Sequence, residues 1–180
     1  MFVQHQGKDK ELGRIVGGLG LPSDRPGFAL IIGEEKTPRI GTEPYKGEYH
    51  YHLLAEAEEM NLEKLLACCE DFAQRFNVRE FFTPVYNTPS IHFWQTWKDQ
   101  CKKPISFDLS FPPYCKENGQ ISWHLNHLLG LAEKSVLHLA NGPLTEARLL
   151  EILPEQIADA TDSQFPAIAA FAYPVSQLSL

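Results

Sequence analysis

Three extended segments follow one another between residues 27 and 59, and they constrain the fold more than any other feature of the chain. The run FALIIG at 28–33 is apolar throughout, as in a buried strand, and it ends in the acidic pair Glu34 and Glu35. EYHYHLLAEAEE at 48–59 alternates between apolar and polar residues, and RIGTEPYKG between these two segments predicts a weak strand or a hairpin. Because the connections are short, we expect the segments to pair as an antiparallel meander.

The alternation within 48–59 assigns its side chains to two faces of the expected sheet. Residues two apart in a strand point the same way, so the two sets follow directly from the order of the residues. One set is Tyr49, Tyr51, Leu53, Ala55 and Ala57, and the other is His50, His52, Leu54, Glu56 and Glu58.

A helix follows the third segment. Apolar residues recur at spacings of three and four from Leu62 to Phe76, which predicts an amphipathic helix. Asn61 is well suited to cap its first turn, and Asn77 can end it in a left-handed conformation.

The rest of the chain alternates between strand and helix patterns. We expect strands at 80–87, 105–111 and 136–141, and helices at 90–102, 120–135, 144–153 and 163–173. A meander that leads into alternating strands and helices predicts an α/β protein with a mixed β-sheet flanked by helices. We therefore expect a single domain over 27–180 and an N-terminal arm or extension over 1–26, where glycines interrupt any periodicity.

Charge and cysteine usage exclude several classes of protein. The net charge is −7 at pH 7 and no block of Lys or Arg occurs, so we expect at most weak binding to DNA by this chain alone. No apolar stretch reaches the roughly 18 residues that a membrane helix needs. Four cysteines without a CxxC pair, together with the lack of a signal-peptide pattern, predict a reduced cytoplasmic protein.

Two stretches resemble the nuclease domain of phage terminase large subunits, which has the ribonuclease H-like fold. YHLLAEAEEMNLEKLLACCEDFAQRFNV, followed by EFFTPVYN, is similar to the third strand, first helix and fourth strand of that domain. ADATDSQFPAIAAFAYPVSQL is similar to its last helix, in which an acidic residue precedes an alanine-rich apolar run. The resemblance implies a phage or prophage origin and cleavage of phosphodiesters by two divalent ions, Mg²⁺ or Mn²⁺, held by carboxylates.

The resemblance also implies where these carboxylates stand. Such domains draw them from the first strand, the fourth strand or first helix, and the last helix. The positions that match are the candidate catalytic residues Glu34, Glu35, Glu63 and Asp162, with Asp159 as a nearby substitute for Asp162. The candidate metal ligands are Glu34, Glu35, Asn87 and Asp162. Asn87 departs from the family pattern, because an acid is expected at the end of the fourth strand.

Each candidate acid also has an ordinary structural interpretation. Glu34 and Glu35 can solvate the end of a strand, Glu63 can interact with a helix dipole, and Asp162 can cap a helix. Two functions are therefore compatible with the sequence. One is a metal-dependent DNA endonuclease, for which the carboxylates must converge. The other is a non-catalytic interaction or structural module that retains the fold without a cofactor, in which they point to different surfaces.

The two functions imply different partners. A nuclease acts on DNA, whereas a module of this family would bind phage packaging proteins or a second copy of the chain. The nucleotide-binding pattern GxxxxGK[ST] is missing, so a packaging ATPase would have to be a separate polypeptide.

Four histidines form a further candidate constellation. His50 and His52 lie two apart on an expected strand, and His124 and His127 lie three apart on an expected helix, so each pair shares a face. Four imidazoles could bind zinc or iron, although no HExxH motif accompanies them. The alternative is that these are ordinary surface or core histidines.

Aromatic and sulfur-containing side chains have mainly structural interpretations. Trp94 and Trp97 lie at helical spacing, which favours a core or protein contact over stacking on bases. Cys68 and Cys69 stand among apolar helix positions and are expected to be buried structural residues rather than nucleophiles.

Overall fold

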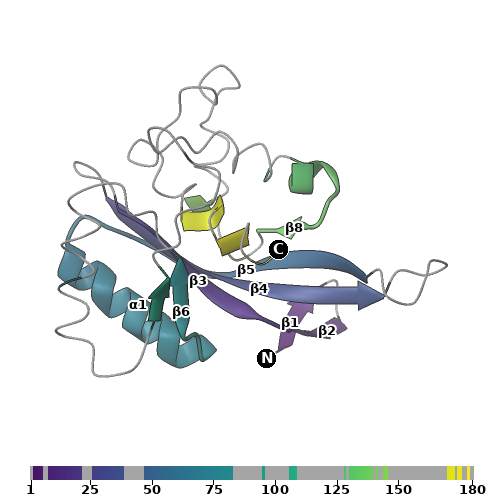
Figure 1. Cartoon of the computed structure of the whole chain (residues 1–180), viewed down its shortest axis with the longest axis horizontal. Coiled ribbons are helices and arrows are strands. Elements are labelled where there is room, and N and C mark those ends of the chain that lie inside the picture. The colour runs from purple at the N-terminus through teal and green to yellow at the C-terminus, as the bar shows by residue number, and fades with distance from the viewer. Residues whose placement is uncertain are drawn as a thin grey trace, which may run out of the picture.

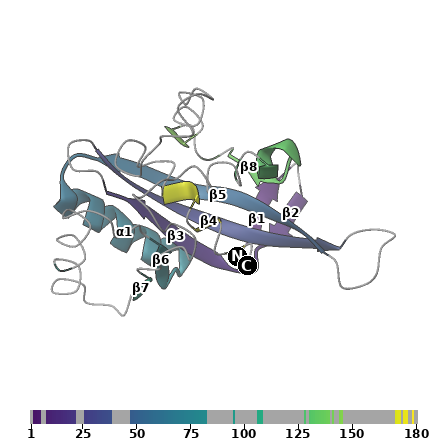
Figure 2. The same ribbon diagram turned by 45° about the horizontal axis from the view of Figure 1, so that its top comes forward.

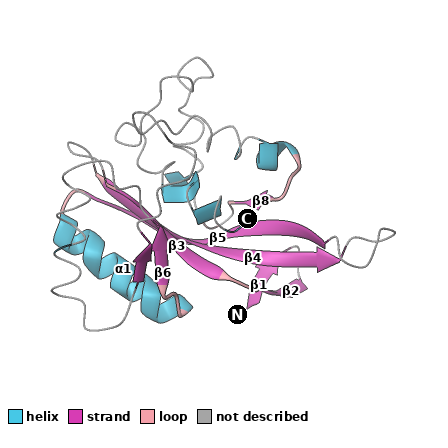
Figure 3. Cartoon of the chain, viewed as in Figure 1, coloured by secondary structure: helices cyan, strands magenta, loops and turns pink. Residues whose placement is uncertain are grey.

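The computed structural model describes residues 2–5, 8–21, 26–38, 47–82, 95, 106–108, 128, 130–139, 141, 144–145, 170–172, 174–175 and 178 of the 180-residue chain. Its strands are β1 (Phe2–His5), β2 (Lys8–Glu11), β3 (Ile15–Gly20), β4 (Gly27–Pro38), β5 (Gly47–Glu59), β6 (Glu80–Phe82), β7 (Ser106–Asp108) and β8 (Leu137–His138). The helix α1 spans Leu62–Phe76 (Figure 3).

Six of these strands form one mixed sheet in the order β7-β6-β3-β4-β5-β8. β3, β4 and β5 pair antiparallel, whereas β6, β7 and β8 each run parallel to their neighbours. β1 and β2 form a separate antiparallel pair (Figure 1). This confirms the predicted α/β class, with a mixed sheet that starts in an antiparallel meander and has the ribonuclease H-like arrangement.

The meander begins earlier than the sequence predicted. Residues 1–26 were expected to form an arm outside the domain, yet β3 lies in this range and is a central strand of the sheet, between β6 and β4. The strand at Gly27–Pro38 is therefore the second of the meander, and Gly47–Glu59 is the third. The weak strand expected at 39–47 falls, apart from its last residue, outside the described residues.

Glycines explain why β3 was mistaken for an arm. IVGGLG has low strand propensity because glycine loses more backbone entropy than other residues and contributes no side chain. In the structure, however, a Cβ on Gly18 would overlap the carbonyl of Ala170, and one on Gly17 would overlap the ring of Phe81. β3 has glycine at these two positions because the ring of Phe81 on the neighbouring strand β6 and the C-terminal segment approach its backbone closely.

Two layers cover the two faces of the sheet. α1 packs on one face, which we call the α1 face, with a core that includes Leu19, Ile31 and Phe81. The described helical turns near the C-terminus pack on the other face, the C-terminal face, where Phe171 and Val175 meet strand residues such as Leu30. Figures 1 and 2 show α1 and the yellow C-terminal turns on opposite sides of the sheet.

A β-bulge in β5 corrects the predicted division of its side chains. Ile31 pairs with Ala55 and Ile32 pairs with Leu53, so Leu54 is an extra residue in the ladder. The alternation reverses at this point: Leu53 packs in the core of the C-terminal face, whereas Ala55 packs against the core of the α1 face. The expectation that Tyr51 and Leu53 share a face with Ala55 and Ala57 is therefore wrong.

The helix α1 matches its prediction at both ends. The side chain of Asn61 accepts hydrogen bonds from the backbone N–H groups of Glu63 (2.8 Å) and Lys64 (3.2 Å). Asn77 ends the helix with a φ of 53°, in the left-handed region. Its buried residues, Leu65, Leu66, Cys69, Phe72 and Ala73, form the stripe that the spacing predicted.

The later segments match their predicted types at most of the described residues, although 134–135 form a turn, only 137–138 of the strand expected at 136–141 are extended, and helical residues continue beyond 173. β6, β7 and β8 lie within the strands expected at 80–87, 105–111 and 136–141. Residues 95, 128, 130–133, 144–145 and 170–172 are helical, as expected. Within the described part of the chain, no helix is both long enough and apolar enough to span a membrane.

A carboxylate on β5 fixes the helical turn at 144–145. Glu56 accepts hydrogen bonds from the backbone N–H of Leu144 (2.7 Å), and from the N–H (2.8 Å) and Oγ1 (2.6 Å) of Thr145. The bulge places Glu56 on the C-terminal face, so this carboxylate attaches a distant segment to the sheet by satisfying N–H groups at the start of a helical turn.

Replacing Gly18 by alanine should destabilise the protein, because its methyl group would collide with the Ala170 carbonyl. We expect the free energy of unfolding to fall by about 1–3 kcal/mol. Gly130→Ala is the matched control, because Gly130 is helical and nothing lies within 4 Å of its added Cβ. Chemical denaturation of both variants should show Gly130→Ala unchanged or more stable, and equal stabilities would contradict the close packing at β3.

Glu56→Ala should loosen the turn at Leu144 and Thr145, because it removes the acceptor of three hydrogen bonds. We expect a loss of about 1–2 kcal/mol, as for other helix caps. Hydrogen exchange of the Leu144 and Thr145 amides should accelerate. Glu48→Ala, also on β5 but with an exposed side chain, should leave these amides as protected as in the parent protein.

Candidate functional site

Glu34 and Glu35 lie on β4, the second strand of the meander, and not on its first strand as predicted. They also point to opposite faces. Glu34 pairs with Tyr51, which packs in the core of the C-terminal face, whereas Glu35 pairs with His50 on the α1 face. The two adjacent acids therefore cannot both serve one site on a face of the sheet.

Glu63 lies far from both of these acids. It stands in the first turn of α1, where Leu65 packs against Gly27 at the start of β4. Glu35 is eight residues further along β4, which corresponds to roughly 26 Å of extended strand. Two catalytic metal ions lie only about 4 Å apart, so Glu63 and Glu35 cannot share such a pair. Asn87, Asp159 and Asp162 fall outside the described residues.

The first strand of the meander carries no acidic residue. β3 reads Ile-Val-Gly-Gly-Leu-Gly, and its C-terminal face is filled at Gly18 by Ala170 and Pro174. Glu34 does not replace the missing carboxylate. It lies four residues beyond Leu30, the partner of Gly18 on β4, and thus roughly 13 Å away along the strand.

The environment of Glu34 disfavours a negative charge. Burial raises the pKa of its carboxyl group, and the nearby positive charges of Arg14 and Lys36 only partly oppose this effect. Its backbone is held by hydrogen bonds in both directions, from Gly13 N–H to the Glu34 carbonyl and from Glu34 N–H to the Arg14 carbonyl, each 2.8 Å. Arg14 is also paired with Glu80 on β6, at 2.8 Å.

Glu35 forms a buried pair with a histidine on the next strand. His52 Nε2 lies 2.8 Å from Glu35 Oε2, and the two residues are only 2% and 6% exposed. Gly33 stands opposite His52 in the ladder, and Leu12 packs over it, so this pair is sealed from solvent. Such a pair can bind and orient neighbouring groups, but it cannot reach a macromolecular substrate.

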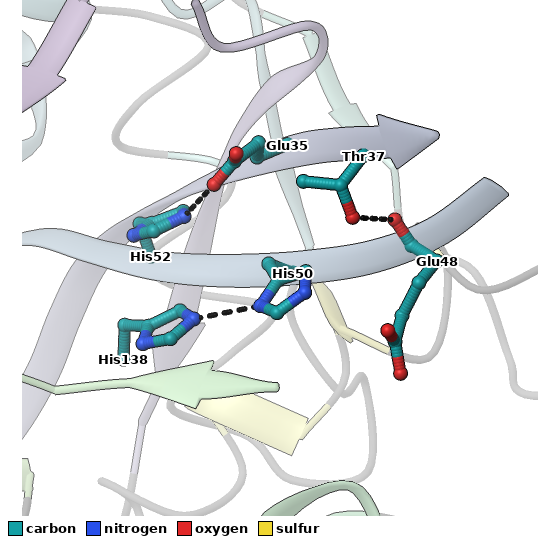
Figure 4. A network of polar contacts seen from close by, with 6 residues as sticks. All are labelled: Glu35, Thr37, Glu48, His50, His52 and His138. Atoms are coloured by element: carbon teal, nitrogen blue, oxygen red, sulfur yellow. Dashed lines mark hydrogen bonds and ion pairs between the residues drawn. The ribbon is translucent and has the colours of Figure 1, made fainter. Parts of the chain in front are cut away.

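Two further histidines, His138 and His50, extend the Glu35–His52 pair toward solvent. His138 on β8 stacks on His52, with ring centroids 4.5 Å apart and planes 15° apart. Its Nε2 lies 2.9 Å from Nδ1 of His50, so one of the two rings donates an N–H hydrogen bond to the other. Figure 4 shows the four side chains converging from β4, β5 and β8. We call Glu35, His50, His52 and His138 the histidine cluster.

The sequence anticipated only half of the histidine cluster. His50 and His52 share a face, as the strand period predicted, while their expected partners His124 and His127 lie outside the described residues. His138 was not singled out, although its place in the strand pattern VLHLAN could have marked it. The position of His138 beside His52 depends on the parallel pairing of β5 with β8, and no local sequence pattern encodes that pairing.

The remaining candidates do not form a site. Among the described side chains, no group of three or more His, Cys, Asp or Glu residues has a geometry that could hold a metal ion. Cys69 is buried, as expected, and Cys68 is half-buried with a thiol pKa raised by burial and by the charges of Glu59 and Asp71. Trp94 and Trp97 lie outside the described residues.

The chain was compared with known families, proteins and structures. No protein-family model matches it, and no curated protein matches it. Among solved structures it is similar to the crystal structure of the fowlpox virus Holliday junction resolvase, with 8% sequence identity and a TM-score of 0.46. The similarity covers 92% of this chain and 98% of that chain.

Glu35→Ala should destabilise the protein, because it removes the hydrogen-bond partner of a histidine that is only 2% exposed. We expect a loss of about 1–3 kcal/mol, the usual cost of leaving a buried polar group without its hydrogen-bond partner. The double variant Glu35→Ala/His52→Leu should lose less than the sum of the two single changes in urea denaturation. Glu34→Ala on the other face is the control and should change stability little or increase it, and additive losses would show that Glu35 and His52 are not coupled.

Proposed function

We propose that this chain is a phage- or prophage-derived ribonuclease H-like domain, related to terminase nuclease domains, that works as a non-catalytic interaction or structural module. The separation of the acids carries this proposal. Glu34 and Glu35 point to opposite faces of β4, and Glu63 stands at the other end of the β4–β5 ladder. Carboxylates arranged in this way cannot jointly bind the two ions that phosphodiester cleavage requires.

The packing at the central strand supports the same conclusion. A metal-binding carboxylate on the C-terminal face of β3 needs open space beside it, whereas Gly18 is closed off by Ala170 and Pro174. The protein has used this position to bring its C-terminal segment directly onto the sheet. Close packing of this kind stabilises a scaffold at the position where a nuclease would keep a cleft.

Charge determines the kind of partner that such a module would bind. A net charge of −7 without a basic block gives little attraction for a phosphate backbone. The partner class that follows is protein, which for a domain of this family means phage packaging proteins or a second copy of the chain. DNA would then be reached through the partner and not by this chain alone.

The alternative is a divalent-metal-dependent endonuclease, and the strand order favours it, because the fold is the one on which such sites are built. An active site in this chain would have to rely on Asp162 and Asn87 with Mg²⁺ or Mn²⁺.

Incubation of the full chain with supercoiled plasmid at millimolar Mn²⁺ tests the proposal. We expect nicking no faster than in a metal-free control, because Glu34 and Glu35 point to opposite faces and Glu63 stands at the other end of the ladder. Asp162→Ala and Glu63→Gln should behave as the parent protein does. Nicking that requires Mn²⁺ and is abolished by Asp162→Ala would overturn the proposal and establish the endonuclease.

A further inference from the structure

The solvent-facing half of the histidine cluster brings two imidazole nitrogens from different strands into hydrogen-bonding contact. His50 Nδ1 and His138 Nε2 face one another at 2.9 Å, and the two rings are within 11° of parallel. Both residues are only half-buried, so that an ion and its water molecules can approach them. Two imidazole nitrogens bound to one tetrahedral zinc ion lie roughly 3.3 Å apart, given bonds of about 2.0–2.1 Å. A small opening of the pair would admit the metal once the proton between the two rings moves to the other nitrogen of its ring or to solvent, since only an unprotonated nitrogen can bind the ion.

We propose that His50 and His138 bind one divalent transition-metal ion of the imidazole-preferring class, typified by Zn²⁺, with water completing its coordination. Imidazole nitrogen suits zinc and its neighbours, whereas Mg²⁺ and Mn²⁺ prefer oxygen ligands. This site is therefore distinct in position and in chemistry from the carboxylate site that the sequence suggested. It does not depend on whether the chain is a nuclease or a module.

The buried half of the cluster orients the second ligand. The ring of His138 stacks on His52, and His52 is held by Glu35 on the neighbouring strand. The backbone adds to this constraint, because Tyr51 N–H donates to the Val136 carbonyl at 2.9 Å and His52 pairs with His138 in the ladder. Ligands that are fixed before the metal arrives lose little entropy when it binds.

The consequence of metal binding is a cross-link at the edge of the sheet. His50 and His138 are 88 residues apart in the sequence, and β8 is joined to β5 by only two residue pairs. An ion held by both side chains would stabilise this edge, because it binds the folded arrangement and not the unfolded chain. The metal would thus determine how firmly the segment around β8 is attached to the meander.

Calorimetric titration of the tag-free full chain with Zn²⁺ tests the proposal. We expect one ion to bind, and both His50→Gln and His138→Gln to weaken the affinity by at least about tenfold, because each removes one of two ligands. The double variant His124→Gln/His127→Gln changes histidines outside the cluster and should bind as tightly as the parent protein. Circular dichroism identifies any variant that does not fold, and using two separate ligand variants keeps the test decisive.

The ligand atoms can be identified directly. Two-bond ¹H–¹⁵N spectra of the histidine rings should show Zn²⁺ on Nδ1 of one ring and Nε2 of another, and the pair of shifted signals should disappear in His138→Gln. Failure to bind Zn²⁺ at millimolar concentration would overturn the proposal. Unchanged affinity in both single variants, or loss of binding only in His124→Gln/His127→Gln, would do the same and would assign the metal to other residues.

Discussion

The fold depends on how closely its layers approach the central strand β3. Gly17 and Gly18 allow Phe81 on one face and Ala170 on the other to lie where side chains of the strand would otherwise stand. β6 pairs with β3 through these same two glycines, so the parallel half of the sheet and the C-terminal segment both adjoin them. A protein interior is as densely packed as an organic crystal, and a single methyl group at such a point has no space to occupy. The pairing of β6 with β3 and the packing of the C-terminal segment on the sheet therefore both depend on two glycines, which have low strand propensity.

The same packing leaves no room for a carboxylate on the C-terminal face of β3 at Gly18. A carboxylate on the central strand must have solvent or a metal ion beside it, because a buried charge without a partner is very costly. Here the space is occupied by backbone and proline. Three of the described acids have identifiable structural positions: Glu35 pairs with His52, Glu56 holds a distant turn, and Glu63 stands in the first turn of α1.

Sequence patterns predicted the parts of the fold that local physics controls. The helix α1 was predicted with both of its caps, and the strand types of β4, β5, β6, β7 and β8 followed from hydrophobic periodicity. β3 was missed because its glycines are explained only by residues 81 and 170, which are far away in the sequence. The same limitation hid His138, whose position beside His52 depends on a parallel pairing. Because the strand at 28–33 was predicted to be the first, Glu34 and Glu35 were assigned to the first strand of the meander, whereas they lie on its second strand.

The bulge at Leu54 shows how one extra residue serves both faces of the sheet. Before it, β5 directs His50 and His52 to the α1 face, beyond the region that the helix covers. After it, Ala55 and Ala57 take over that face beneath α1, where small residues are needed, and Glu56 turns to the C-terminal face to meet Thr145. In an unbroken strand, Glu56 would continue the face of His50 and His52 and would point its charge into the core beneath α1. The bulge is thus the feature that lets a single strand hold the histidine cluster, an apolar helix contact and a polar cap.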